Sequence, residues 1–312
     1  MTGLFSGESI VDWLINSLRL EATVFHAGRY CGAWQASTAG RLLGSFHLVL
    51  DGHCWLHRPG HPSLALGPRD SVFFLQDVPH RLSSEPEGAA QPPTAPMLPL
   101  SAPAERSATG LACGFFQFGG SMVQLLLESL PECIVIRADE AGGEQVNVLF
   151  QLIRQEAGDT PDHPPPLLAR LVEVLFFYAI RHATRQGGPQ ALGVWGLAHH
   201  PRMAGLLTDI LSQPGEPWTV ALMARHVHMS RTNFCRHFIE LTGQPPAAFL
   251  ASLRMSIAAR RLEHGDTIEL VADYVGYRSS AAFSRAFKKI IGEQPGAWRR
   301  ASRDVGPRPL MQ

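Results

Sequence analysis

Two arginines near the end of the chain stand in the same local pattern, Phe-x-Arg-x-Phe. Arg236 is at the centre of the first copy, residues 234–238, and Arg285 is at the centre of the second, residues 283–287. Side chains four residues apart share one face of a helix, so each phenylalanine pair predicts a buried face with its arginine directed elsewhere. An exposed arginine can donate two parallel hydrogen bonds to guanine O6 and N7 in the major groove. The pattern therefore indicates two helices that read DNA bases.

The residues before each copy favour the turn that such a helix needs. The two segments read ARHVHMSRTNFCRHF and ADYVGYRSSAAFSRAF. Gly276 tolerates a positive φ in the second turn at no steric cost, and His228 occupies that place in the first turn. Ser230 and Ser279 then stand where an N-cap residue accepts backbone hydrogen bonds. Two helix-turn-helix units are therefore predicted.

The two predicted recognition helices differ in the polar side chains that they offer to DNA. We expect DNA contacts from Arg231, Thr232, Cys235, Arg236, Ser280, Ala281, Ser284, Arg285, Lys288 and Lys289. The two lysines suit phosphates, which add affinity without sequence information. Because the second helix offers fewer hydrogen-bonding groups, we expect the first unit to discriminate bases and the second unit to anchor the DNA backbone.

Charge is distributed unevenly along the chain, although the formal net charge is zero. Up to Gly196 there are 12 arginines and no lysine against 18 acidic residues, and from Leu197 onward there are 15 basic against 9 acidic residues. This asymmetry predicts that the C-terminal part faces a polyanion. Since the five cysteines lack framework spacing and neither a signal peptide nor an apolar run of about 18 residues occurs, we expect reduced thiols in a cytoplasmic protein without a membrane partner.

The first half of the chain has the pattern of short strands. Apolar runs alternate with Gly, Pro and Asp about every 8–12 residues, which predicts a small antiparallel barrel or sandwich. The runs are ATVFHA, CGAWQAS, SFHLVL, HCWLH, SLAL, SVFFL, HRLSS and LACGFFQF. Residues 85–106 are rich in Pro, Ala and Ser and predict a long exposed loop. A long helix at 167–184 is apolar on more than one face, which favours packing on the barrel and is compatible with contact to a partner subunit.

The C-terminal region resembles a known bacterial family, the AraC-type (AraC/XylS) transcriptional regulators. The resemblance rests on GQPPAAFLASLRMSIAARRL and IELVADYVGYRSSAAFSRAFKKIIGEQPGAWRR, within residues 201–300. It implies two helix-turn-helix units joined by one long helix, here about 246–264, which sets both recognition helices into adjacent major grooves. His228 departs from the family, which usually has glycine at this place.

This resemblance also implies the domain organisation. The segment SFHLVLDGHCWLHRPGHPSLALGPRDSVFFLQDVPHRLSS resembles the cupin-type sensor of one branch of these regulators. The expected fold class is α+β, with an N-terminal cupin-like β-barrel plus dimerisation helices and a C-terminal all-α domain. We expect an effector-binding and dimerisation domain at 1–184, a linker at 185–196, the DNA-binding domain at 197–300 and a flexible tail at 301–312.

Candidate ligands for an effector or a metal lie in the barrel segment. Cupin enzymes hold a metal through two His, a Glu and a third His, whereas Ser45 falls where the Glu would be and the upstream His-x-His is absent. His47, His80 and Cys113 could still form a zinc-like site. Alternatively, the histidines are satisfied inward polar residues and the cysteine is a small core residue. The tentative ligand-binding residues are Trp34, His47, Trp55 and His80, within an apolar lining that also includes Phe46, Phe73, Phe74 and Phe116.

These patterns favour a sequence-specific DNA-binding transcription factor, and not an enzyme, that responds to a small effector. We expect a homodimer that binds double-stranded DNA and, if it is an activator, contacts RNA polymerase. Three alternatives remain open. They are a metal-dependent cupin enzyme with a DNA-binding appendage, an architectural DNA binder whose N-terminal half only dimerises, and a redox sensor that uses Cys31, Cys54 and Cys113.

Overall fold

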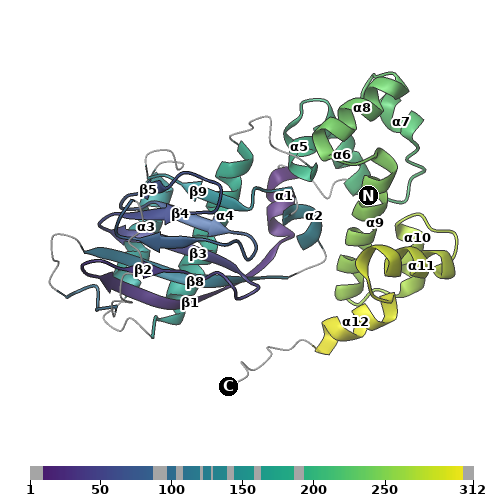
Figure 1. The fold of residues 1–312 in the computed structure, drawn as a ribbon. Coiled ribbons are helices and arrows are strands. Elements are labelled where there is room, and N and C mark those ends of the chain that lie inside the picture. Colours follow the sequence, from purple (N-terminus) through teal and green to yellow (C-terminus); the bar gives the residue numbers. More distant parts are fainter. Residues whose placement is uncertain are drawn as a thin grey trace. The chain divides into compact units, whose positions relative to one another are not determined.

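The chain forms two compact units (Figure 1). The sheet unit comprises residues 20–119 and 131–186, and the helical unit comprises residues 1–19, 120–130 and 187–312. The computed structural model describes residues 10–86, 97–102, 108–119, 122–127, 129–138, 144–157, 163–185 and 193–304. A unit built on antiparallel sheets and a second, helical unit confirm the predicted α+β class.

Two sheets make up the core of the sheet unit. One has the strand order β1-β8-β3-β6-β9 and the other β2-β7-β4-β5. The strands are β1 (Arg19–Tyr30), β2 (Gln35–Ala36), β3 (Gly44–Asp51), β4 (Cys54–His57), β5 (Leu64–Leu66), β6 (Ser71–Phe74), β7 (Arg81–Ser83), β8 (Thr109–Gly119) and β9 (Cys133–Ile136). Each of the eight predicted apolar runs contributes a strand, and β9 is an additional one.

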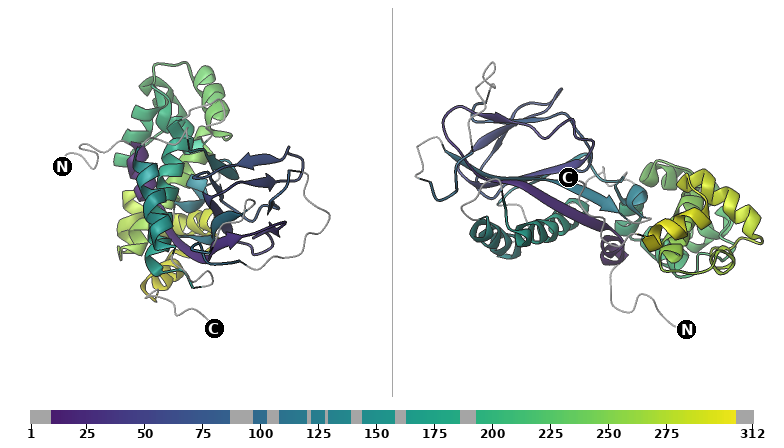
Figure 2. Two further views of the ribbon diagram at one scale, coloured as in Figure 1. Left: turned by 90° about the vertical axis from the view of Figure 1, so that its left-hand side faces the viewer. Right: turned by 90° about the horizontal axis from the view of Figure 1, so that it is seen from below.

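The two sheets enclose an apolar core between them (Figure 2). Val49 and Leu111 point into this core from the five-stranded sheet, and Leu56 and Leu82 from the four-stranded sheet. Because side chains alternate along a strand, neighbouring residues face the opposite side of each sheet. The interior that sequence alternation predicted for β3 is therefore the space between the sheets.

The opposite face of the five-stranded sheet packs on two helices, α3 (Glu144–Glu156) and α4 (Pro166–Arg185) (Figure 2). The Phe176 ring of α4 lies 4.8 Å from the Phe116 ring and 5.7 Å from the Phe73 ring, measured between centroids. The Phe46 ring lies against the same Phe116 ring, with centroids 4.8 Å apart and the ring planes tilted by 38°. These three sheet phenylalanines therefore belong to the helix-covered layer, and their predicted place in the interior lining was wrong.

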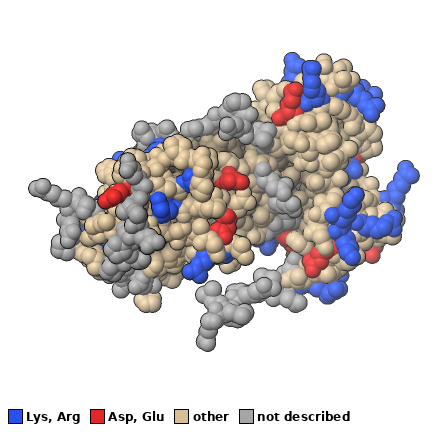
Figure 3. Space-filling model, viewed as in Figure 1, with Lys and Arg blue, Asp and Glu red and all other residues tan. Residues whose placement is uncertain are grey.

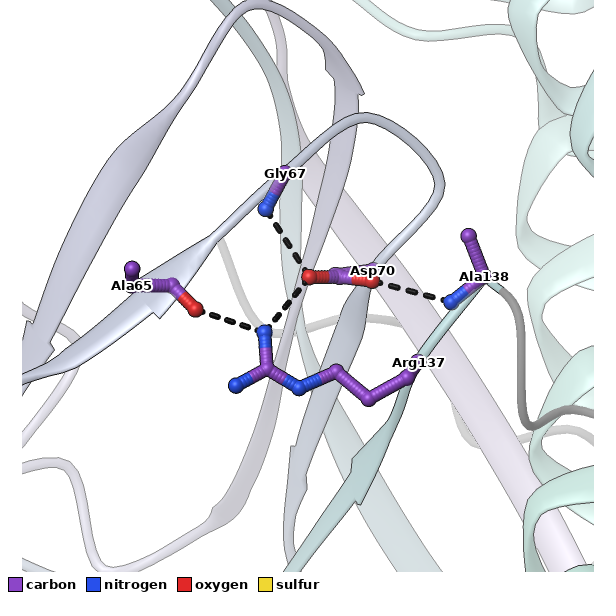
Figure 4. Close-up of polar contacts among 5 residues, drawn as sticks. All are labelled: Ala65, Gly67, Asp70, Arg137 and Ala138. Atoms are coloured by element: carbon purple, nitrogen blue, oxygen red, sulfur yellow. Dashed lines mark hydrogen bonds and ion pairs between the residues drawn. The ribbon is translucent and has the colours of Figure 1, made fainter.

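A polar cluster joins the two sheets at one end (Figure 4). The Asp70 carboxylate accepts hydrogen bonds from the backbone N–H groups of Gly67 and Ala138, each within 2.9 Å, and from the Arg137 guanidinium at 2.8 Å. Arg137 also donates to the carbonyl of Ala65 on β5 at 2.6 Å. Since β5 belongs to one sheet and Arg137 follows β9 of the other, this buried carboxylate fixes the two sheet ends to each other.

The helical unit contains ten described helices. They are α1 (Ile10–Asn16), α2 (Val123–Leu127), α5 (Gly193–His199), α6 (Met203–Ser212), α7 (Val220–His226), α8 (Arg231–Thr242), α9 (Pro246–Glu263), α10 (Ile268–Tyr274), α11 (Ser280–Ile291) and α12 (Pro295–Asp304). The long helix α9 matches the predicted connecting helix at 246–264. Among all described residues, no helix is long and apolar enough to span a membrane.

The unit boundaries differ from the expected domain boundaries in three places. Helices α1 and α2, expected within the first domain, cluster with the helical unit, where Trp195 donates to the carbonyl of Leu126 at 2.9 Å. Arg260 on α9 donates to the Ser17 hydroxyl at 2.9 Å. Residues 193–196, expected in the linker, begin α5 and are buried. Helix α12 continues to Asp304, and the rest of the expected tail, 305–312, lies outside the described residues.

Part of the predicted 85–106 loop packs on the sheet. Leu98 exchanges two backbone hydrogen bonds with Arg29 of β1, at 2.7 and 2.8 Å. Met97 packs against the core between the sheets. Residues 97–102 are therefore attached to the sheet and mostly half-buried, although Leu98 and Ser101 are exposed as predicted, and 87–96 and 103–107 lie outside the described residues.

Candidate nucleic-acid interface and interior site

The first helix-turn-helix unit consists of α7 and α8. Its turn contains His228 with a φ of 56°, a left-handed conformation that most side chains avoid. The His228 side chain is exposed, so no packing conflict accompanies this conformation. Ser230 caps α8 by accepting from the Asn233 backbone N–H at 3.3 Å. The predicted positive φ and the predicted N-cap are both confirmed.

The second unit consists of α10 and α11, and its turn contains Gly276 with a φ of 82°. A β-carbon at this position would lie 2.6 Å from the carbonyl oxygen of Gly215, in the loop before α7. Glycine is therefore required both by the backbone conformation and by close contact between two backbones. Ser279 caps α11 through the Ala282 N–H at 3.2 Å, as predicted.

The loop that contacts Gly276 is also fixed by the connecting helix. Arg254 of α9 donates to the carbonyl of Pro214 and to the carbonyl of Glu216, each at 2.7 Å. Phe238 of the first unit packs on Phe249 of α9, with ring centroids 5.4 Å apart. The two helix-turn-helix units are therefore joined through α9 and through direct backbone contact, so their recognition helices keep a defined spacing.

All ten predicted DNA-contacting residues have side chains that reach the surface. Seven of them are exposed and three are half-buried; the half-buried ones are Cys235, Ser280 and Ser284. The phenylalanine pairs on both recognition helices are buried, which directs the arginines outward. Figure 3 shows Lys and Arg side chains over both helix-turn-helix units. This arrangement provides two basic helix faces suited to a polyanion.

Asn233 is an exposed residue on α8 that was not among the predicted DNA contacts. Its side-chain oxygen lies 3.5 Å from an Arg236 guanidinium nitrogen. An asparagine on a recognition helix can make two hydrogen bonds to adenine N6 and N7. The sequence could have indicated Asn233 through its polar side chain at the third position of the predicted recognition helix. The corresponding residue of α11 is Ala282, so Asn233 increases the difference between the two helices.

The interior of the sheet unit contains a buried polar cluster. His47 of β3 and His80, just before β7, face each other with their Nε2 atoms 2.9 Å apart. Thr38 Oγ1 lies 3.2 Å from the His47 Nε2 and 3.0 Å from the His80 Nε2. The Thr38 hydroxyl also contacts Ser45 Oγ at 2.9 Å. All four side chains are less than 9% exposed, so they are polar groups enclosed by an apolar core.

The surroundings of both histidines in this cluster favour the neutral imidazole. Burial lowers the pKa of the His47 imidazole well below its usual value, and His80 lowers it further. Burial also lowers the pKa of His80. The His80 Nδ1 donates to the carbonyl of Val78 at 2.7 Å, which leaves its Nε2 as an unprotonated acceptor. Neutral imidazoles are the form that binds metal ions.

The two predicted interior tryptophans lie on different faces of the sheet unit. Trp34 is fully buried between the sheets and stacks on Tyr30, with ring centroids 4.7 Å apart. Trp55 lies on β4 between Cys54 and Leu56, which both face the core. Since alternation directs Trp55 to the opposite face, the structure removes it from the interior lining.

Cys113 contacts His47, but not at the nitrogen that faces His80. Its Sγ lies 3.1 Å from the His47 Nδ1, on the other side of the imidazole ring. The predicted trio of His47, His80 and Cys113 therefore does not converge on one point. Among the described residues, no three His, Cys, Asp or Glu side chains are placed to hold a metal ion. The usual cupin ligand set does not fit either, because Ser45 stands in place of its glutamate.

Three buried or half-buried thiols of the sheet unit lack the environment of reactive cysteines. All five cysteines of the chain are free. Burial raises the pKa of the Cys54 thiol to about 12 and that of Cys133 to about 11. Burial also raises the pKa of Cys113. Because the thiolate is the reactive form, these surroundings disfavour a redox role for Cys54 and Cys113, two of the three candidate redox cysteines.

Comparisons with known proteins agree with a sheet unit followed by helix-turn-helix units. A cupin family model matches residues 10–185, and a helix-turn-helix domain model matches residues 223–301. An AraC-like transcription regulator of Streptomyces lividans is 29% identical over 94% of this chain and 97% of the relative. RclR of Escherichia coli K12, an RCS-specific HTH-type transcriptional activator, is 26% identical over 84% of this chain and 86% of the relative. The DNA-binding domain of AdpA, solved with a target DNA, is 34% identical over 34% of this chain and 96% of that chain, with a TM-score of 0.32.

The two capped helix-turn-helix units define a DNA-binding protein. With a cupin model covering more than half of its residues, the chain belongs to the cupin-containing branch of the AraC-type helix-turn-helix transcription regulators. Double-stranded DNA is accordingly the partner of the helical unit. The named relatives are regulators, which favours this function over the cupin-enzyme alternative.

Proposed function

We propose that this regulator reads an operator mainly with α8 and anchors on it with α11, under the control of an effector held by the sheet unit. The observation that carries the proposal is the pair of exposed helix faces, joined through α9 and the Gly215–Gly276 contact. The ten predicted residues, together with Asn233, are the proposed DNA contacts. Regulation then requires that the effector binds two arrangements of the protein with different affinity.

A selection from random duplexes tests the DNA-reading part of this proposal. The full-length chain should enrich a defined sequence with two half-sites about one helical turn apart. Binding to the enriched duplex should be tighter than binding to its scrambled counterpart by about 1000-fold or more. Enrichment of no sequence would instead support the architectural DNA binder.

We also propose a homodimer that forms through α3 and α4. Four large apolar side chains on these helices are between 41% and 52% exposed, namely Val148, Leu152, Leu167 and Val174. On α3 the two residues are four apart and on α4 seven apart, so each pair shares a helix face. A second copy is the occupant that suits this surface, because a twofold axis would pair the same apolar faces and would match two operator sites.

Sedimentation velocity of the full-length chain tests the dimer. The double substitution Leu167→Glu and Val174→Glu places charges on the apolar face and should yield monomers. The control Leu42→Glu changes a leucine that is 90% exposed elsewhere in the sheet unit and should leave the dimer intact. A dimer that survives the double substitution would contradict the proposed interface. If the dimer is an activator, it would contact RNA polymerase in the cytoplasm when bound to DNA.

A further inference from the structure

A pair of histidines connects the first recognition helix with the turn between α5 and α6. The Nε2 atom of His237, on α8, lies 3.0 Å from the Nε2 atom of His200, in that turn. The ring centroids are 4.9 Å apart and the ring planes meet at 73°. Both side chains are half-buried. The contact therefore joins α8 to a part of the helical unit outside the two helix-turn-helix units.

The backbone next to His200 determines which of its ring nitrogens carries the proton. The His200 Nδ1 accepts hydrogen bonds from the backbone N–H groups of Arg202 and Met203, at 3.2 and 3.3 Å. A ring nitrogen that accepts an N–H has no proton of its own, so the neutral His200 is protonated on Nε2. His200 thus satisfies backbone groups at the start of α6 with one nitrogen and donates to His237 with the other.

The proton of His237 follows from this arrangement. Its Nε2 accepts from the His200 Nε2–H, so the neutral His237 carries its proton on Nδ1. That Nδ1 lies 3.4 Å from a carboxylate oxygen of Glu240, which is an acceptor. Each of the four ring nitrogens therefore has a partner of the matching kind, and the hydrogen bonds run from the start of α6 through both imidazoles to Glu240.

A further proton cannot enter this chain of hydrogen bonds without breaking a contact. On the His237 Nε2 it would face the His200 Nε2–H, and on the His200 Nδ1 it would face the N–H groups of Arg202 and Met203. Glu240 also faces the pair, but its side chain is 61% exposed, so solvent weakens its attraction for a protonated His237. The contact is therefore complete only while both imidazoles are neutral.

The surroundings of His200 favour this neutral form at ordinary pH. Burial lowers the pKa of His200 below its usual value of 6.5, and His237 and Arg202 lower it further. A histidine whose pKa is lowered by folding stabilises the folded arrangement above the usual value, and this contribution is lost as the pH falls through the lowered pKa. Acidification below about pH 6.5 is therefore the condition that opposes the contact.

Helix α5, which ends at His199, provides a fixed support for His200. It packs against α1, α2 and α8. Its Trp195 is 1% exposed and donates to the carbonyl of Leu126 on α2 at 2.9 Å. The titratable side chain that α5 contributes beside the pair is His199, whose Nδ1 contacts the Trp195 carbonyl at 3.0 Å. The histidine contact therefore ties α8 to a buried layer of the helical unit.

We propose that His200 and His237 position α8 for base reading and that acidification releases this contact. His237 directly follows Arg236 on α8, so loss of the contact would alter how Arg236 is directed at a base. A proton on the pair adds positive charge, which leaves the attraction to phosphates undiminished. Falling pH should therefore reduce sequence discrimination without weakening binding to DNA in general. This inference rests on the proposed reading of an operator by α8.

Nitrogen NMR of the histidine rings in the full-length chain tests the contact without DNA. At about pH 7.5, above the usual imidazole pKa, His200 should carry its proton on Nε2 and His237 should carry its proton on Nδ1. Spectra of His200→Asn and His237→Gln assign the two rings. A His237 with its proton on Nε2 at this pH would overturn the proposed contact.

The positioning role is tested with the duplex enriched by selection and its scrambled form. Between about pH 7.5 and about pH 5.5, discrimination by the wild-type chain should fall by about 3-fold to 10-fold, the change expected from one hydrogen bond. Affinity for the scrambled duplex should not fall. Equal discrimination at both pH values would overturn the positioning role. If selection enriches no duplex, the reading of DNA by α8 fails, and the tautomers still decide the histidine contact by themselves.

Substitutions separate the titration from the positioning. His237→Gln keeps an acceptor for the His200 Nε2–H and does not titrate, so it should retain wild-type discrimination at about pH 7.5 and lose most of the pH dependence. His237→Leu removes the acceptor and should lower discrimination by about 3-fold to 10-fold at both pH values. Wild-type discrimination in His237→Leu would contradict the proposal.

Two more variants complete the test. His200→Asn keeps an acceptor for the backbone N–H groups of α6, so it separates the start of α6 from the contact with α8 and remains informative if His237→Leu does not fold. It should lose discrimination as His237→Leu does. His264→Gln is the matched control, because His264 is an exposed histidine at the end of α9. The control should keep the wild-type pH profile, and loss of the pH dependence in His264→Gln would assign the titration to another histidine than the pair.

Discussion

The two helix-turn-helix units share one backbone plan and differ in what their helices present. Both have a seven-residue first helix and a twelve-residue recognition helix, a serine N-cap and a C-terminal glycine in the left-handed conformation. The second turn is one residue longer, because Val227 precedes Ser230 by three positions and Val275 precedes Ser279 by four. The scaffold is thus nearly the same in both units.

The two units differ in the side chains that their recognition helices turn outward. The outward positions of α8 hold Arg231, Thr232, Asn233 and Arg236, whereas the corresponding positions of α11 hold Ser280, Ala281, Ala282 and Arg285. Conversely, the turn of the second unit is packed tightly against Gly215, and the turn of the first is exposed. The comparison indicates that base-reading groups are concentrated on the first unit and that rigid attachment is concentrated on the second.

The largest expected effect concerns the packed turn. Gly276→Ala adds a β-carbon in a left-handed conformation, which costs about 1–2 kcal/mol, and places it 2.6 Å from a backbone oxygen. With overpacking at about 1–3 kcal/mol, unfolding should become easier by about 3 kcal/mol. Urea unfolding followed by circular dichroism measures this change. An unaltered urea midpoint would show that the turn of the second unit does not require glycine at position 276.

A substantial loss of specificity is expected from Arg236→Ala. Removing one bidentate contact to guanine should reduce discrimination between the selected operator and its scrambled form by about 1–3 kcal/mol, roughly 5-fold to 150-fold. Arg285→Ala is the matched substitution in the second unit and should lower affinity for both duplexes with little loss of discrimination. Fluorescence anisotropy with both duplexes measures the two effects. Equal losses of discrimination in the two variants would show that both units read bases to the same extent.

A smaller, stabilising effect is expected in the first turn. His228→Gly relieves the left-handed conformation, worth about 1–2 kcal/mol, against an entropic cost of about 0.5–1 kcal/mol. The net result should be a gain of about 0–1.5 kcal/mol in the free energy of unfolding. The same urea titration measures it. A destabilised variant would mean that the His228 side chain makes a contact that matters.

The smallest expected effect concerns phosphate contacts. Lys288→Ala on α11 should weaken binding to every duplex alike and reduce the slope of log K against log salt by about 1. Affinities for operator and scrambled DNA at several salt concentrations measure this slope. A loss restricted to the operator would assign Lys288 to base recognition and contradict its anchoring role.

Features set by local chemistry could be predicted from the sequence. The serine caps, the positive φ of His228 and Gly276, and the buried phenylalanine pairs depend on residues within one or two turns of each other. The strands of the first half followed from their apolar patterns, because alternation reports burial of one face. These predictions succeeded where the determinants lie next to each other in the chain.

Features that depend on distant residues could not be predicted. Asp70 and Arg137 are 67 positions apart, and no local pattern signals their ion pair. The same is true of Gly215 against Gly276, whose contact depends on how the two units pack. Strand alternation correctly placed His47 inside, but only the folded loop brings Thr38 to it. The register of β3 against β8 places Cys113 next to the other ring nitrogen.

The measurement that tests the inequality of the two units most directly is duplex selection repeated with the wild-type chain, Arg236→Ala and Arg285→Ala. The wild type should select one strongly specified half-site and one weakly specified half-site. Arg236→Ala should erase the preference in the strong half-site, and Arg285→Ala should leave it intact. Two equally specified half-sites in the wild type, or loss of the strong half-site in Arg285→Ala, would contradict the account.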